Sequence, residues 1–183
     1  MDIRIHKIVK GSRANGPGIR NVVWFQGCTL DCPGCFNPLT HDPLQGEMIS
    51  AGRLCDNLLD PSSPCDGITI SGGEPFQQAS ALLSLLKLLR GMNAPPILVF
   101  SGFTESALRK NKLFSSCLKH IDALICGPYR HRLPPAYERF CSSRNQKLVL
   151  LSDRYHTEDF RDLPLNEIII DPQGNAEISG IYF

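Results

Sequence analysis

Three cysteines lie within eight residues of one another, at Cys28, Cys32 and Cys35. Thiolates are soft ligands that suit iron–sulfur clusters or zinc. Three thiolates on a [4Fe–4S] cube leave one iron without a protein ligand, and that iron could chelate a substrate through an amine and a carboxylate. Gly34, between the last two cysteines, lets the loop wrap tightly around a cluster. The C-x-x-x-C-x-x-C spacing therefore predicts a [4Fe–4S] cluster at these cysteines.

Two other interpretations of the triplet stay open: a structural zinc site with a distant fourth ligand, and three ordinary buried thiols. A structural zinc site needs four ligands and is commonly built from paired C-x-x-C units. No second C-x-x-C follows, and the nearest histidine, His41, lacks a partner at zinc-finger spacing. Of the five other cysteines in the sequence, four are most simply small buried or loop residues: Cys55, Cys65, Cys117 and Cys141.

The segment Ser71-Gly72-Gly73-Glu74-Pro75 is the second place where the sequence suggests chemistry. Its adjacent glycines let backbone N–H and C=O groups approach a ligand without obstruction from a Cβ atom. Glu74, near a predicted helix start, can accept hydrogen bonds from an amine or from backbone donors. Pro75 suits the first helical turn. Alone, the segment is also an ordinary strand–turn–helix connection.

Hydrophobic patterning predicts the elements that must position these two loops. Short apolar or alternating stretches predict strands at residues 3–9, 21–25, 67–70, 96–100, 121–125, 147–151 and 167–170, and residues 176–178 could pair back as a hairpin beyond a turn at 171–174. Helices are predicted after the cap candidates Ser50 and Thr104, and over residues 76–90. Strands that alternate with helices indicate a parallel α/β sheet, in which ligands gather at the carboxyl ends of strands. Both loops would lie at such ends.

The composition is ordinary for a soluble globular protein, with 42% hydrophobic and 20% charged residues. The length fits one domain, residues 1–183. A formal net charge of +1 gives no reason to expect a general nucleic-acid or membrane surface. The start of the chain lacks a signal-peptide apolar block, and the most apolar run, residues 81–89, is too short to span a bilayer. We therefore expect a cytoplasmic chain, in whose reducing surroundings clustered cysteines indicate metal binding rather than disulfides.

Together, the cysteine spacing and the Gly-Gly-Glu-Pro loop resemble those of the radical S-adenosylmethionine superfamily. A narrower resemblance covers most of the chain and points to glycyl-radical-enzyme activating enzymes, in particular those of the anaerobic ribonucleotide reductase type. It rests on six segments that occur in the same order: residues 15–20, 26–28, 32–38, 101–104, 122–129 and 142–147.

The resemblance implies that the chain binds a [4Fe–4S] cluster and S-adenosylmethionine. The Gly-Gly-Glu-Pro loop would bind the methionine amino group, and the open iron would take the amino and carboxylate groups. One electron then splits the cofactor into methionine and a 5′-deoxyadenosyl radical, which abstracts hydrogen. The implied fold is α/β, an incomplete and open parallel (β/α) barrel, because the chain is too short for eight β/α units.

Three functional hypotheses follow. The first is an oxidoreductase that takes a glycine hydrogen from a glycyl-radical enzyme such as anaerobic ribonucleotide reductase, and that needs a one-electron donor such as a flavodoxin or ferredoxin. The second is a radical enzyme that modifies a peptide or small molecule. The third is a non-catalytic iron–sulfur binding or electron-transfer module.

Four further residues are candidates for the cofactor site. Asn145 and Gln146 would bond the ribose or carboxylate of S-adenosylmethionine, and Ser101 would line its site. Asn37 would order the cluster loop through its amide. Each also has an ordinary interpretation as a polar loop or turn residue.

Two residues depart from the activating-enzyme pattern. Phe36 stands where histidine is frequent and gives the cluster an apolar neighbour. Cys126 replaces an aspartate that lies near the cofactor in related enzymes, and a neutral thiol cannot supply that charge. These departures favour the second hypothesis. The densest basic region is either solvated surface or a docking site for an acidic electron donor or a partner's loop: Arg130-His131-Arg132, Arg139, Arg144 and Lys147.

Overall fold

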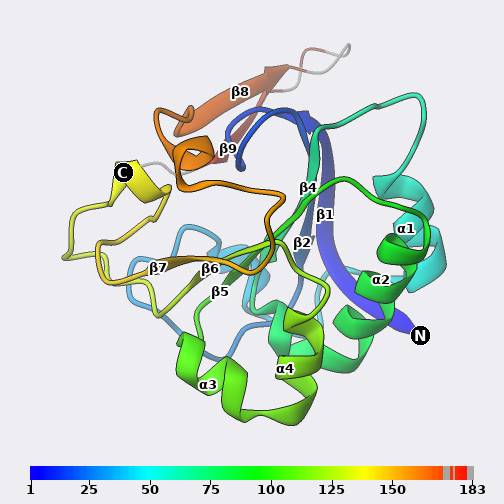
Figure 1. The fold of residues 1–183 in the computed structure, drawn as a ribbon, viewed down its shortest axis with the longest axis horizontal. Helices are drawn as coiled ribbons and strands as arrows, with labels where there is room; N and C mark the ends of the chain where they lie inside the picture. Colours follow the sequence, from blue (N-terminus) through cyan, green and yellow to red (C-terminus); the bar gives the residue numbers. More distant parts are fainter. Residues whose placement is uncertain (171–173, 175, 181–183) are drawn as a thin grey trace.

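The computed structural model describes residues 1–170, 174 and 176–180. A seven-stranded sheet has the order β3-β1-β2-β4-β5-β6-β7, and a second sheet pairs β8 with β9 (Figure 1). The strands are β1 (Asp2–Ser12), β2 (Arg20–Phe25), β3 (Glu47–Ser50), β4 (Gly67–Gly72), β5 (Ile97–Ser101), β6 (Ala123–Cys126), β7 (Lys147–Leu150), β8 (Asn166–Ile170) and β9 (Ala176–Gly180). The α-helices are α1 (Ala51–Leu58), α2 (Ala79–Gly91), α3 (Glu105–Lys110) and α4 (Lys112–Leu118). Short 3-10 turns are η1 (Pro38–Thr40), η2 (Pro75–Gln78), η3 (Tyr137–Arg139) and η4 (Thr157–Phe160).

The centre of the large sheet is parallel and its edges are antiparallel. Strands β2, β4, β5 and β6 run in parallel, whereas β1, β3 and β7 pair antiparallel to their neighbours. The predicted α/β class is confirmed, whereas the predicted incomplete, open parallel (β/α) barrel stays a prediction. The antiparallel edges were not predicted: the connection between β1 and β2 is a short turn, which suits antiparallel strands because a parallel pair needs a longer crossover.

The two faces of this sheet have different covers. Helices α1 to α4 pack on one face, where Ile97 and Val99 of β5 join the main hydrophobic core (Figure 1). On the other face Leu98 of β5 packs in a second core against Phe140, from the long segment after β6, and Phe160, from the segment after β7. The alternation along β5 therefore sends successive side chains to opposite faces, as expected for a strand buried on both sides. No helix in the described part of the chain is long and apolar enough to cross a membrane.

Local capping agrees with most of the expected helix starts. The Ser50 hydroxyl accepts a hydrogen bond from the Arg53 amide, and the Thr104 hydroxyl accepts one from the Ala107 amide. The helix expected from residue 76 instead begins with the 3-10 turn η2, and α2 starts only at Ala79.

The smaller elements give one further difference and one agreement. Strand β3 was missed, and it pairs with the start of β1. The expected pairing of residues 176–178 is confirmed by the β8–β9 hairpin. Residues 171–173 of the expected turn lie outside the described residues, and the expectation of a single domain stays a prediction.

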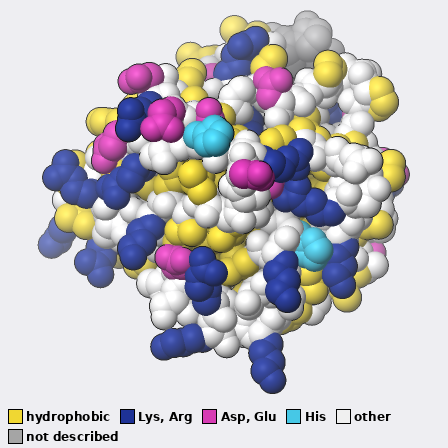
Figure 2. Space-filling view, in the orientation of Figure 1, with side chains coloured by type: hydrophobic (Ala, Val, Ile, Leu, Met, Phe, Trp, Pro, Cys, Tyr) yellow, Lys and Arg dark blue, Asp and Glu magenta, His cyan; other side chains and the backbone are white. Residues whose placement is uncertain are grey.

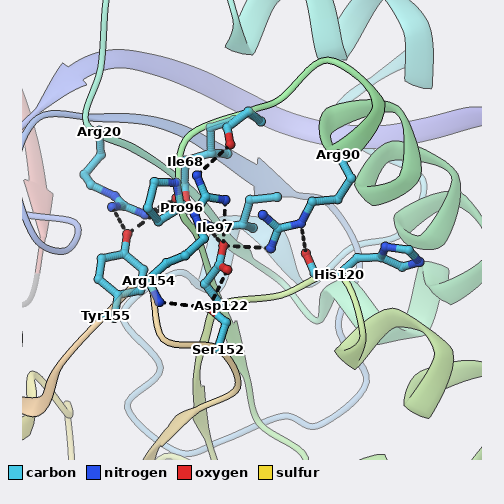
Figure 3. Close-up of polar contacts among 11 residues, drawn as sticks. Arg20, Ile68, Arg90, Pro96, Ile97, His120, Asp122, Ser152, Arg154 and Tyr155 are labelled. Atoms are coloured by element: carbon cyan, nitrogen blue, oxygen red, sulfur yellow. Dashed lines mark hydrogen bonds and ion pairs between the residues drawn. The ribbon is translucent and has the colours of Figure 1, made fainter.

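Asp122 ties the amino ends of the central strands together (Figure 3). This buried carboxylate accepts hydrogen bonds of 2.7 Å from the Arg90 guanidinium, the Ile97 amide and the Ser152 hydroxyl. Arg154 adds an ion pair at 3.6 Å. Because buried carboxylates are costly unless paired, this network holds β5, β6 and the segment after β7 in fixed relation.

Arg20 makes a second anchor beside it. The side chain is fully buried and donates to the Thr69 hydroxyl at 2.9 Å, to the Ile68 carbonyl and to the Tyr155 hydroxyl. Burial lowers the pKa of this guanidinium. Both anchors lie at the amino ends of the parallel strands, so they stabilise the sheet at the end opposite to the two predicted loops.

Candidate functional site

A single pocket brings the two predicted loops together. It lies where β2, β4 and β5 end. Its lining comes from the cysteine loop (residues 27–40), from the Gly-Gly-Glu-Pro loop and from the end of β5, and includes Cys28, Cys32, Cys35, Gly72, Gly73 and Ser101. The carboxyl ends of parallel strands are the expected place for a ligand in such a sheet. The expected meeting of these two loops therefore agrees with the geometry.

The cysteine loop is closed at its base. The Gly27 amide donates to the Thr40 carbonyl at 2.7 Å, so the two ends of the loop meet. The buried side chain of Gln26 donates to the carbonyls of Leu39 and Asp42 at 3.0 and 2.8 Å. These bonds hold the three cysteines within one pinned loop.

Two further contacts fix the interior of this loop. The backbone amide of Thr29 donates to the side-chain oxygen of Gln77 at 3.2 Å, and the side-chain amide of Gln77 donates to the Thr29 hydroxyl at 2.7 Å. This pair ties the loop to η2. The Cys35 amide donates to the Cys32 carbonyl at 3.1 Å and forms a turn between these two cysteines. The Asn37 amide donates to the sulfur of Cys35 at 3.4 Å. Asn37 lines the pocket, and this contact with the cysteine loop is made by its backbone; the expected role of its side-chain amide stays a prediction.

The thiols of this loop are partly buried. Burial raises the pKa of Cys28 and of Cys35. The nearby Glu74 raises the pKa of Cys28 further, and the nearby Cys32 raises that of Cys35. These groups are therefore neutral until a metal displaces their protons.

Gly72 and Gly73 are required by contacts within the protein. Gly72 has a φ of +106°, and a Cβ atom there would lie 2.4 Å from the backbone nitrogen of Phe25. A Cβ atom on Gly73 would lie 2.3 Å from the carbonyl oxygen of Gly27. The Gly-Gly-Glu-Pro loop can therefore lie directly against the start of the cysteine loop only because both residues lack a side chain.

Glu74 is buried beside the pocket and does not line it. Its carboxylate accepts hydrogen bonds from the Gly102 amide at 2.7 Å, from the Phe76 amide at 3.0 Å and from the Ser101 hydroxyl at 3.0 Å. Burial raises the pKa of Glu74 to about 7, although these donors act in the opposite direction. Pro75 is buried as well and also lies off the pocket surface. Direct contact of these two residues with a cofactor stays a prediction.

The remaining candidates divide between two cavities. Ser101 and Gln146 line the pocket, but their polar groups already bond to the protein: Ser101 to Glu74, and Gln146 to the Gly127 carbonyl at 3.1 Å. Asn145 lies instead in a neighbouring cavity, where its amide donates to the Pro128 carbonyl at 2.7 Å. The structure therefore separates Asn145 from the other candidates.

The two departures from the family pattern have different surroundings. Phe36 lines the pocket, and its ring lies against that of Tyr129 with centroids 4.7 Å apart. Cys126 is buried in the main core and lies at the neighbouring cavity. Burial raises the pKa of its thiol to about 11, so it carries no charge near pH 7.

The pocket also has a side that sequence reasoning missed. Trp24, Asn15 and residues 178–180 of β9 also line it. The amide of Asn15 donates to the Ser179 hydroxyl at 2.7 Å and so joins the hairpin to the turn before β2. One indication in the sequence places Asn15 in the site, because it begins one of the segments that carry the family resemblance. Nothing in the sequence of the hairpin indicated where it would pack.

Comparison with known proteins agrees with this site. The 4Fe–4S single cluster domain family matches residues 14–149. Over 127 residues, 65% of this chain, the sequence is 35% identical to a pyruvate formate-lyase-activating enzyme of Clostridium pasteurianum. The alignment covers 53% of that enzyme, so the chain spans about half of its length. Over 140 residues, 73% of this chain, it is 28% identical to the anaerobic ribonucleoside-triphosphate reductase-activating protein of Enterobacteria phage T4, of which 85% is covered.

QueE from Escherichia coli superposes on 57% of this chain and 54% of its own, with 18% identity and a TM-score of 0.49. The sequence matches confirm the resemblance to glycyl-radical-enzyme activating enzymes. The segment that matches the family, residues 14–149, includes all three clustered cysteines and the Gly-Gly-Glu-Pro loop. This chain belongs to the 4Fe–4S single cluster domain family.

Proposed function

We propose that this chain is a radical S-adenosylmethionine enzyme that activates a glycyl-radical enzyme. Cys28, Cys32 and Cys35 would hold a [4Fe–4S] cluster, and S-adenosylmethionine would bind in the pocket beside it. One observation carries the proposal: the cysteine loop and the Gly-Gly-Glu-Pro loop line the same pocket at the carboxyl ends of parallel strands. The names of the two relatives support the activating role.

When bound, the cluster supplies the electron that splits S-adenosylmethionine into methionine and a 5′-deoxyadenosyl radical. The protein contributes position and exclusion of water. Gly72 and Gly73 expose backbone groups to the pocket, and the buried Glu74 holds the Ser101–Gly102 corner beside them. Phe36, Tyr129 and Trp24 give the pocket apolar walls, which suits a radical that must not react with solvent.

The residues that hold a cofactor in this proposal all lie on rigid supports. The cysteine loop is pinned by Gln26 and by the pair Thr29–Gln77, and the glycines pack against the end of β2. A site placed on fixed elements orients reacting atoms more closely than one on free loops. In this chain the orientation of the cofactor would come from these contacts with the sheet.

A second candidate is a radical enzyme that modifies a peptide or small molecule. One observation favours it: the neutral, buried thiol of Cys126 stands where related activating enzymes have an aspartate near the cofactor. The two candidates share the radical chemistry and differ in the hydrogen donor. A glycyl-radical enzyme offered as substrate, with the glycyl radical read by electron paramagnetic resonance, separates them.

The first test is production of 5′-deoxyadenosine. The protein is reconstituted anaerobically with iron and sulfide, then given dithionite and S-adenosylmethionine, with Cys32→Ala as the control. We expect product from the wild type and none from the variant. A wild-type cluster that forms well, but yields no 5′-deoxyadenosine and whose spectrum does not change with S-adenosylmethionine, would favour a non-catalytic iron–sulfur module.

A further inference from the structure

The long loop after β6 and the first residue of β7, together residues 127–147 and called the basic loop below, carry a concentrated positive charge. It holds five Lys or Arg side chains and one carboxylate, Glu138, so its formal charge is +4 in a chain of formal charge +1. Glu138 lies 3.3 Å from Arg139, the nearest of these cations. Figure 2 shows dark-blue side chains gathered on the left of the molecule, over the part that is yellow in Figure 1. The five cations, of which all but Arg139 are exposed, are Arg130, Arg132, Arg139, Arg144 and Lys147.

This basic loop lies against the outside of the cysteine loop. A Cβ atom added to Gly34, between the second and third cysteines, would lie 3.0 Å from the Cβ of His131. Next to it the rings of Tyr129 and Phe36 are in contact, with centroids 4.7 Å apart. Pro33, Gly34 and His131 are all exposed. Exposed cations therefore flank the stretch of cysteine loop that reaches the surface.

The same cations are kept apart from the pocket. Tyr129, Phe140 and Gln146 of the basic loop line it, whereas Arg130, His131 and Arg132 are not part of its lining. A hydrogen-donor substrate must enter the pocket to reach the cofactor. A protein bound over the exposed cations would instead approach the cysteine loop at its exposed residues Pro33 and Gly34. From there an electron can reach the cluster without crossing the pocket.

We propose that residues 130–132, with Arg144, form the docking surface for a small acidic one-electron carrier protein. The proposal rests on the proposed function and names the partner of that site. The reduced carrier loses one electron, and the oxidised cluster gains it. Carboxylates around the carrier's prosthetic group would pair with these arginines, and complementary charge speeds the encounter of such partners and fixes their orientation.

The test compares two double variants with equal change in charge. Arg130→Glu with Arg132→Glu reverses the proposed surface, and Arg53→Glu with Lys87→Glu reverses two exposed cations on α1 and α2, on the opposite side of the molecule in Figure 1. The probe is an acidic flavodoxin. Its oxidised form is titrated calorimetrically into the cluster-loaded protein at low and high salt, and its reduced form is mixed with the protein while bleaching of the cluster absorbance is followed.

We expect the variant at residues 130 and 132 to lose about tenfold in flavodoxin affinity and in flavodoxin-driven reduction rate at low salt, and high salt to weaken the wild type similarly. Reduction by dithionite should match the wild type, and the α1–α2 variant should lose less than about twofold in either flavodoxin measurement, because only its long-range field has changed. Equal flavodoxin behaviour of the two double variants would overturn the docking surface. A wild-type protein whose cluster is reduced by dithionite but which never cleaves S-adenosylmethionine would count against the proposed function instead. The comparison of flavodoxin affinities would still test the docking surface, because it does not depend on that cleavage.

Discussion

The carboxylate of Glu74 accepts a hydrogen bond from the backbone amide of Gly102 at 2.7 Å. Glu74 follows β4 and Gly102 follows β5, so this bond joins the carboxyl ends of two neighbouring parallel strands. The same carboxylate bonds to Ser101, which lines the pocket. In this chain the acidic residue of the Gly-Gly-Glu-Pro loop thus has a positioning role within the protein.

The buried carboxylate of Glu74 should make stability depend on pH. Its pKa of about 7 in the folded protein lies above the ordinary value of 4.5, so the folded state binds a proton more tightly than the unfolded state. The free energy of unfolding should therefore fall as pH rises from about 4.5 to 7, by on the order of 1 kcal/mol per pH unit. Urea unfolding of the metal-free protein at several pH values measures this slope.

The matched variants for this test are Glu74→Gln and Asp56→Asn. Glu74→Gln removes the titrating group and should flatten the slope, whereas Asp56 is exposed on α1 and its substitution should leave the slope unchanged. If Glu74→Gln and the wild type lose stability in parallel over this range, the carboxylate is not the titrating group.

Gly73 should tolerate no side chain. A Cβ atom there meets the Gly27 carbonyl oxygen at 2.3 Å, a backbone atom that can move only with the whole cysteine loop. Gly73→Ala should lower the free energy of unfolding by about 3 kcal/mol, the upper range for overpacking, and should reduce the iron bound per folded chain. Gly52→Ala is the control, because no atom lies within 4 Å of a Cβ there and the residue is in a helix. The steric argument fails if both variants unfold at the same urea concentration.

The cysteines should separate into two reactive classes. Burial raises the pKa of Cys117 and Cys126 to about 11 and that of Cys141 to about 12, so these thiols are almost entirely protonated at pH 8. The clustered cysteines are partly exposed. Brief iodoacetamide treatment of the metal-free protein, read by peptide mass spectrometry, should label Cys28, Cys32 and Cys35, which the reagent can reach. It should spare Cys117, Cys126 and Cys141, which are buried and almost entirely protonated, because the thiolate is the reactive form.

Reconstitution with iron and sulfide should change this labelling pattern. Cluster binding converts the ligand thiols to metal-bound thiolates and covers them, so Cys28, Cys32 and Cys35 should become protected. Cys65 is partly exposed and lies outside the pocket, and it serves as the internal control that stays labelled. Undiminished labelling of the triplet in protein that has bound iron would assign the iron to other ligands.

How far the sequence predicts this site depends on the range of the interactions involved. The cysteine spacing and the adjacent glycines are local, and each loop lies where the strand before it ends, as expected. The partners of Glu74 and the separation of Asn145 from Gln146 were not predictable, because they depend on contacts between strands far apart in the sequence. The antiparallel edges of the sheet were not predicted either, because apolar periodicity indicates burial but not strand direction.

Asn15 should control how firmly the hairpin covers the pocket. Its amide donates to the hydroxyls of Ser12 and Ser179, each at 2.7 Å, and so links β1, the turn after it and β9 in a buried contact. Asn15→Ala should free β9 locally and increase amide hydrogen exchange in residues 166–170 and 176–180 by about tenfold, since a lost buried hydrogen bond costs on the order of 1 kcal/mol. Because residues 178–180 line the pocket, affinity for S-adenosylmethionine should fall as well. Asn166→Ala, an exposed position in the same hairpin, should leave both quantities near the wild type. Faster exchange with unchanged affinity would mean that the hairpin covers the pocket without contributing to cofactor binding, and unchanged exchange would remove Asn15 as the tie.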